Sequence, residues 1–175
     1  PSWPPAPSSS VAAPRASAAS ARRAWSGAFN LVVAEFMLIG SGRVFLLLAI
    51  AAAVTSYFAD FRQIASPVAL LLLVFALTAH AGRSEARHLL ALTRVAPFAP
   101  MQRRLAFVAA GAAWTLLLAA PALARSFSLE TLSYAAGTGA VAAVVASALA
   151  AVSGSAFAPR LVLLILWYGY SSYSG

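Results

Sequence analysis

Five long apolar runs, separated by short polar segments, constrain this chain more than any other feature of its sequence. Hydrophobic residues make up 62% of its 175 residues and charged residues only 9%, and the mean hydropathy is +0.84. A soluble domain carries about 25% charged residues, which it needs to cover its surface. A bilayer removes that need, so we predict an all-α integral membrane protein, a polytopic bundle of transmembrane helices.

The positions of the apolar runs predict where the chain crosses the membrane. A bilayer core requires ~20 apolar residues of helix, and the first run is somewhat shorter than that. We expect about five spans, at residues 44–59, 67–81, 105–124, 134–152 and 161–174. Pro121 lies near the end of the third run and should kink or end that helix.

The segment before the first span, residues 25–39, has the pattern of an amphipathic helix. Its apolar side chains recur at helical spacing on one face: Phe29, Val32, Val33, Phe36 and Met37. This pattern predicts an interfacial elbow helix that lies in the headgroup plane, and an ordinary buried helix is the alternative. Gly40 and Gly42 predict a turn into the bilayer, because glycine adopts positive φ without penalty.

The N-terminal residues 1–24 are rich in Pro, Ser and Ala and lack an apolar period. This composition predicts a disordered linker. A cleaved targeting peptide, rich in Arg and Ser and free of acids, is the alternative. The chain begins with Pro1 rather than Met, and we expect it to be a fragment of a longer protein.

The charges between the apolar runs predict an orientation in the membrane. One side would carry the N-terminal arginines, Arg43, the segment 82–104 and Arg160, whereas the segments 60–62 and 125–130 on the other side nearly cancel in charge. Cytoplasmic loops of membrane proteins carry an excess of Arg and Lys. We therefore predict that the N-terminus is cytoplasmic and that five spans leave the C-terminus outside.

The longest polar interval between the apolar runs covers residues 80–105 and reads HAGRSEARHLLALTRVAPFAPMQRRL. Its charges can orient a partner protein, and its leucines supply apolar area that a partner's cleft can bury. The predicted partner-binding residues of this coupling loop are Arg83, Glu85, Arg87, Leu89, Leu90 and Arg94. The alternative is a solvated loop whose arginines only set the topology.

The fourth run differs from the others in carrying a small residue at every fourth position. A stripe of small residues lets the backbones of two helices approach closely, which drives helix packing in lipid. The predicted helix-packing residues on this stripe are Gly139, Ala143 and Ser147.

Residues that catalysis or nucleotide binding would need are absent or isolated. The sequence has no Cys and no Lys, which excludes thiol nucleophiles, cysteine–metal sites and the lysine of a P-loop. The four acids form no pair for acid–base catalysis. His80 and His88 lack carboxylates at metal-ligand spacing, and Ser153 is not in a Gly-x-Ser-x-Gly motif. We therefore predict no catalytic residue, cofactor or metal site, and no nucleic-acid partner, because the arginines form no continuous basic face.

Three local patterns carry a resemblance to a known family. They are VVAEFMLIGSGR before the first span, the 80–105 interval after the second, and SGSAFAPRLVLLILWYGY at the end. Together they resemble the C-terminal half of a bacterial type-2 ABC transporter permease. In that family an elbow helix precedes the first span, and a cytoplasmic loop after the second span docks on the ATP-binding subunit.

The docking loops of that family follow a pattern of Gly-x-Arg-Glu-Arg, then a Leu pair and a Pro. This sequence approximates the pattern with Gly82, Arg83, Glu85, Arg87, Leu89, Leu90 and Pro97. It departs from the pattern at Ser84 and Ala86, which separate the three charged residues.

The resemblance implies a multi-pass permease in the bacterial inner (plasma) membrane that is not itself an enzyme. Its implied partners are an ATP-binding ABC subunit that hydrolyses ATP, the lipid bilayer, and a second permease unit or a missing N-terminal half. The competing hypothesis is a non-transport membrane scaffold or assembly factor, and a membrane enzyme ranks third.

Overall fold

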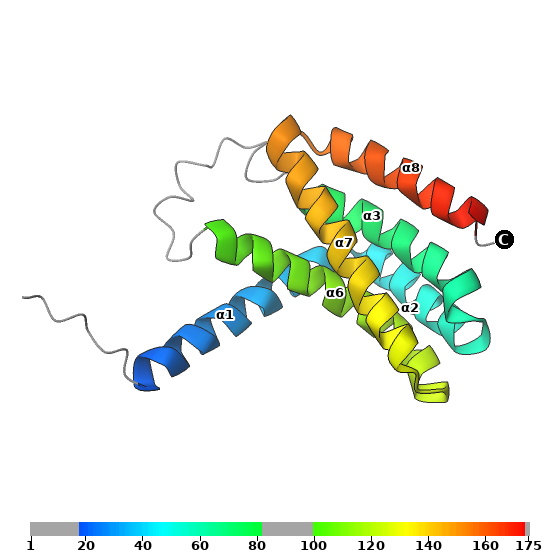
Figure 1. Ribbon diagram of the computed structural model, residues 1–175, viewed down its shortest axis with the longest axis horizontal. Coiled ribbons are helices and arrows are strands. Elements are labelled where there is room, and N and C mark those ends of the chain that lie inside the picture. Colours follow the sequence, from blue (N-terminus) through cyan, green and yellow to red (C-terminus); the bar gives the residue numbers. More distant parts are fainter. Residues whose placement is uncertain (1–17, 82–99, 174–175) are drawn as a thin grey trace, which may run out of the picture.

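The computed structural model is a bundle of α-helices and describes residues 18–81 and 100–173 (Figure 1). The described ranges contain no strand, which confirms the predicted all-α class for this part of the chain. Its elements are α1 (Ala18–Ile39), α2 (Arg43–Phe58), the short π-helix η1 (Phe61–Ala65), α3 (Ser66–Ala81), α6 (Pro100–Arg125), α7 (Leu129–Ser153) and α8 (Phe157–Tyr173).

Three helices of the described chain are long and apolar enough to cross a membrane, at Phe61–Ala81, Met101–Arg125 and Leu129–Ser153. A fourth crossing is counted only if α1 and α2, which are bent by 94° at their junction, form one broken span. The second, third and fourth predicted spans therefore have the required length, whereas the 16-residue α2 and the 17-residue α8 do not have it alone. These helices are compatible with a multi-pass membrane protein.

The spanning helices extend beyond the apolar runs because polar residues at their ends are helical too. Asp60 begins η1, and its side chain accepts hydrogen bonds from the backbone N–H groups of Arg62 and Gln63 at 2.9 and 3.1 Å. Residues 61–65 thus form a helical start to α3, and this second span begins earlier than the predicted residue 67. Pro121 does not end α6, which continues to Arg125.

Two further helix boundaries differ from the predicted ones. Ser128 caps α7 by accepting a hydrogen bond from the N–H of Thr131 at 3.4 Å, so the helix begins at Leu129 rather than at Tyr134. At the other end of the chain, α1 begins at Ala18 and extends into the segment predicted to be a linker. Figure 1 shows α1 projecting away from the other helices at its N-terminal end.

The centre of the bundle is α3, which packs against α2, α6, α7 and α8. The most extensive contact is between α6 and α7. The core side chains that are fully buried between these helices are mostly small, with a few leucines: Leu73, Leu77, Ala110, Ala143 and Ala146. Large apolar side chains such as Leu47 and Val152 are instead exposed on the outer faces, as lipid-facing residues are.

The bend between α1 and α2 is built around Trp114, which lies in the middle of α6. Its ring stacks on Phe36 at a centroid distance of 4.5 Å and meets Phe45 edge-on at 4.9 Å. Its Nε1–H donates a hydrogen bond to the carbonyl oxygen of Phe36 at 2.9 Å. A Cβ atom at Gly40 would overlap the same indole, so glycine is required there to let the ring approach.

This close contact, rather than positive φ, explains Gly40, whereas a Cβ atom at Gly42 would make only ordinary contacts with Phe45. Gly42 has φ −86°, and Gly154 is the one glycine of the described ranges with positive φ, at +63°. The prediction that Gly40 and Gly42 adopt positive φ is therefore wrong, although a sharp bend does occur at this place. Gly154 uses its left-handed conformation to end α7.

Candidate functional site: an apolar groove with a polar end

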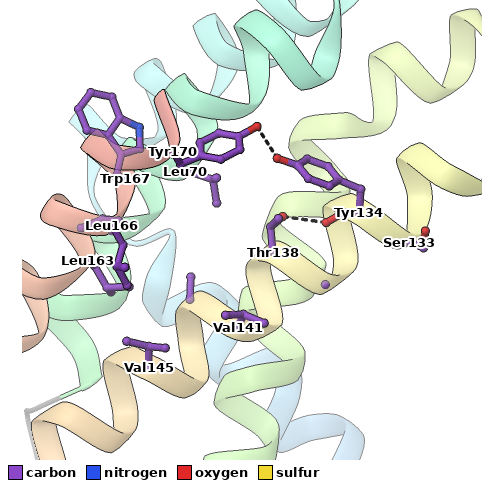
Figure 2. Close-up of a pocket in the computed structure, with 13 residues that line it drawn as sticks. Leu70, Ser133, Tyr134, Thr138, Val141, Val145, Leu163, Leu166, Trp167 and Tyr170 are labelled. Atoms are coloured by element: carbon purple, nitrogen blue, oxygen red, sulfur yellow. Dashed lines mark hydrogen bonds between the residues drawn. The ribbon is translucent and has the colours of Figure 1, made fainter. Parts of the chain in front are cut away.

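A groove of about 420 Å³ lies between α3, α7 and α8 (Figure 2). Its volume falls within the range of about 300–1,000 Å³ that is typical of ligand pockets. Its walls are mainly aliphatic and aromatic, and hydroxyl groups gather at one end. The lining residues are Leu70, Val74, Ser133, Tyr134, Gly137, Thr138, Val141, Ala142, Val145, Leu163, Leu166, Trp167 and Tyr170.

The groove exists because α7 presents small or short side chains where α8 presents large ones. Gly137, Val141 and Val145 recur every four residues on α7 and form one wall. Leu163 and Leu166 of α8 face that wall across the groove in Figure 2. A Cβ atom at Gly137 would meet nothing within 4 Å, so the missing side chain leaves open space.

A hydrogen-bonded cluster of three hydroxyl groups closes one end of the groove and joins three helices. Tyr134 on α7 donates from its hydroxyl to the hydroxyl of Tyr170 on α8, with an O···O distance of 2.5 Å (Figure 2). The Oγ of Ser66 on α3 lies 3.1 Å from each phenol oxygen. Tyr170 also donates to the carbonyl oxygen of Arg62 at 3.0 Å. These hydrogen bonds give each hydroxyl at this end a partner within the protein.

An exposed ion pair lies next to the hydroxyl cluster. The guanidinium of Arg62 contacts the carboxylate of Glu130, and the two side chains are 53% and 72% exposed. The same guanidinium lies 5.1 Å from the centre of the Tyr134 ring, within the range of a cation–π interaction. The groove therefore has an apolar interior, a hydroxyl rim, and one positive and one negative charge just beyond the rim.

This arrangement suits binding rather than catalysis. The described residues that line the groove include no His and no carboxylate that could act as a general base. The lining serine therefore has no base beside it in the groove to activate it as a nucleophile. The described residues contain no group of three His, Cys, Asp or Glu side chains that could hold a metal ion. An amphipathic molecule with one long apolar part matches the groove and its polar end.

The predicted functional residues lie in different parts of the chain, and the structure describes only some of them. The coupling-loop residues lie outside the described residues: Arg83, Glu85, Arg87, Leu89, Leu90 and Arg94. Gly139 and Ala143 are buried where α7 meets α6. Ser147 is half-buried, and its hydroxyl bonds to the carbonyl oxygen of Val144 in its own helix at 3.0 Å. Gly139 and Ala143 thus lie on the face of α7 opposite to the groove.

Sequence reasoning missed the hydroxyl cluster of Ser66, Tyr134 and Tyr170. A signal was present, because these residues stand at the start of the second span, the start of the fourth and near the end of the fifth. The predicted topology brings those three helix ends to the same membrane surface. Tyrosines at a membrane surface are usually interpreted as interfacial anchors. That interpretation gives no reason to expect the two tyrosines to contact each other.

Comparisons with protein-family models, with curated proteins and with solved structures found no match to this chain. Its function is therefore inferred from its own residues and their arrangement.

Proposed function

We propose that this chain is the membrane-spanning permease subunit of an ATP-driven ABC transporter in the bacterial inner membrane. It couples ATP hydrolysis by a partner subunit to the movement of a substrate. The observation that carries the proposal is the basic sequence of residues 82–99, which stands in the chain between α3 and α6. The described helix ends on either side of it belong to the arginine-rich end of the bundle, where Arg103 and Arg104 lie in the first turns of α6.

The difference in charge between the two ends of the bundle supports the orientation. The end with the α3–α6 connection includes Arg43 at the start of α2 and Arg160 near the start of α8. Arg160 donates from Nε to the hydroxyl of Thr78 in the last turns of α3, at 3.3 Å. The opposite end carries two acids and two arginines: Asp60, Arg62, Arg125 and Glu130. By the positive-inside rule the arginine-rich end faces the cytoplasm.

In this proposal α1 is the interfacial elbow helix, and α2, α3, α6, α7 and α8 are five spans. The bend of 94° at the start of α2 supports the elbow. The apolar residues Phe29 and Met37 on α1 are 68% and 65% exposed, as expected of a face that contacts lipid. The two short spans fit a bilayer by local thinning and through interfacial residues such as Arg43 and Tyr168 at their ends.

The packing of α3 suggests how a signal from the ATP-binding partner would reach the rest of the bundle. Closure of two ATP-binding subunits would displace segment 82–99 and with it the ends of α3 and α6. Because α3 contacts α2, α6, α7 and α8, its displacement changes the packing of every other proposed span. The groove, which α3 shares with α7 and α8, would change shape in the same step.

Reversal of two charges in the coupling loop tests the proposal. We expect the double variant Arg83→Glu, Arg87→Glu to lose at least ten-fold in recovery of the ATP-binding subunit from detergent-solubilised membranes. Membrane insertion should be unchanged, because neither residue belongs to a predicted span. The matched control, Arg15→Glu with Arg22→Glu, changes the net charge equally and should leave recovery intact. Full recovery with the loop variant removes the coupling role, and absence of any ATPase from the wild type favours the scaffold hypothesis.

The orientation can be tested independently of the partner, because the chain has no Cys. Ser126, in the connection before α7, and Ser153, the last residue of α7, are both exposed, and each can be replaced by a single Cys. In intact cells a membrane-impermeant maleimide should label Ser126→Cys and should reach Ser153→Cys only after permeabilisation. The reverse pattern contradicts the orientation, and labelling of both from one side contradicts the assignment of α7 as a span.

A further inference from the structure

The groove between α3, α7 and α8 has the dimensions of one lipid acyl chain. Its lining runs from Ser133 to Val145 on α7, which at 1.5 Å per residue is about 18 Å of helix. One leaflet contributes about 15 Å, half of a hydrocarbon core about 30 Å thick. In the proposed topology the groove therefore begins near the polar membrane surface and reaches about as deep as one acyl chain.

The groove is also open to its surroundings on one side. Val141 and Leu166 line it and are 63% and 56% exposed. Two of the three helices that form it, α3 and α7, are long and apolar enough to cross a bilayer, so lipid is the expected medium at this opening. Water would find few partners along these apolar walls.

A helix of another chain does not fit inside this space. A helix about 10 Å across and about 18 Å long occupies on the order of 1,400 Å³, whereas the groove holds about 420 Å³. Only the side chains of such a helix could enter. A single flexible hydrocarbon chain is thinner and can follow the wall formed by Gly137, Val141 and Val145.

The charges at the rim specify the headgroup. The guanidinium of Arg62 can bind a phosphate, for which its planar donors are suited. The carboxylate of Glu130, in contact with that guanidinium, would repel an anionic headgroup but can accept hydrogen bonds from a primary ammonium. A phosphate and an ammonium held a short distance apart are the two charges of a phosphatidylethanolamine headgroup.

We propose that the groove holds one acyl chain of a resident phosphatidylethanolamine, with its phosphate on Arg62 and its ammonium on Glu130. The lipid fills the space between α7 and α8 and so stabilises their separation at this depth. In the proposed orientation it belongs to the outer leaflet. A scaffold with the same groove would bind the same lipid, so the inference does not depend on ATP-driven transport.

Photocrosslinking in proteoliposomes of the full-length protein tests the proposal. Phosphatidylethanolamine, phosphatidylglycerol and phosphatidylcholine, each with a diazirine in one acyl chain, would be compared at equal concentration, and the labelled peptides would be mapped. We expect labelling centred on residues 137–145, at least five-fold stronger with phosphatidylethanolamine than with either of the others. Phosphatidylcholine has the same net charge but a quaternary ammonium that cannot donate to Glu130.

Two variants separate the chain site from the headgroup site. Gly137→Leu fills the groove and should reduce labelling at least five-fold, whereas Gly169→Leu adds the same side chain at an exposed position with nothing within 4 Å and should not. Glu130→Gln should abolish the preference over phosphatidylglycerol and leave labelling of the groove in place. The Arg62–Glu130 pair is exposed, and such pairs contribute only about 0–1 kcal/mol to stability, so this variant should fold.

Three outcomes would overturn the proposal. Labelling of α7 no stronger than that of the lipid-exposed residues Leu47 and Ile50 on α2 would indicate ordinary annular lipid. Equal labelling by the three headgroups would remove the role of Arg62 and Glu130. No labelling between residues 137 and 145 would mean that protein or a transported molecule occupies the groove.

Discussion

Replacement of Trp114 by alanine is expected to loosen the bend between α1 and α2 and to lower the free energy of unfolding by about 3 kcal/mol. This value is the lower end of the range for Trp→Ala in protein cores, because lipid is as apolar as the protein interior and reduces the transfer contribution. The indole is 4% exposed and contacts both sides of the bend, through Phe36 of α1 and Phe45 of α2. Its removal leaves a cavity at the junction.

The expected loosening can be measured as a distance distribution. Spin labels on Ala28→Cys in α1 and Leu47→Cys in α2, both exposed positions, report on the two arms of the bend. The distribution should be narrow in the wild type and broad in Trp114→Ala.

Two further variants accompany this measurement. Trp114→Phe keeps most of the ring but loses the hydrogen bond to Phe36, which costs about 1 kcal/mol. Leu117→Ala, half-exposed on the same helix, is the control, and an unchanged distribution in Trp114→Ala would mean that α1 holds its position without the indole.

The role of Trp114 could not be predicted from composition, but its position contains a signal. Tryptophan in membrane proteins concentrates at the two interfaces, and this one lies in the middle of an apolar run. A tryptophan at that depth needs an acceptor for its N–H group. Which acceptor it finds depends on the path of α1, and the sequence of α6 contains no information about that path.

The helices themselves were largely predictable, whereas their ends were not. Apolar runs locate the helices because lipid excludes charged side chains from the hydrocarbon core. They do not locate helix ends, because the first turns of α3 and α7 are set by caps at Asp60 and Ser128. Capping depends on one side chain and a few backbone N–H groups, and hydropathy is insensitive to both.

The groove was not predictable from the sequence, although the small residues of α7, which forms one of its walls, were recognised there. The small-residue stripe on α7 was assigned to packing, and Gly139 does lie against α6. Gly137, two residues earlier, faces open space instead. In a run so rich in alanine and glycine, either face could pack tightly. The positions of α3 and α8 decide which small residue meets a backbone and which leaves a cavity.

Substitution of Gly139 is expected to have the second large effect, because α6 and α7 are in close contact there. A Cβ atom at this position would overlap the hydroxyl of Thr115 and would lie 2.6 Å from the carbonyl oxygen of Gly111. Thr115 is 2% exposed, and Gly111 contributes rigid backbone, so neither can move aside. The two helices must separate. We expect Gly139→Ala to lower the free energy of unfolding by about 1–3 kcal/mol, the usual cost of overpacking, and Gly139→Leu to prevent assembly of the bundle.

Gly137→Ala is the matched control, since it makes the same chemical change two residues away on the opposite face of the same helix. Its new methyl group meets nothing within 4 Å, and alanine favours a helix over glycine by up to about 1 kcal/mol. In detergent, thermal unfolding followed by tryptophan fluorescence should therefore give a lower Tm for Gly139→Ala, by roughly 4–8 °C for a loss of 2 kcal/mol. Gly137→Ala should leave the Tm unchanged or raise it. If both variants unfold at the wild-type temperature, α6 and α7 do not pack through Gly139, and the close contact between these two helices is wrong.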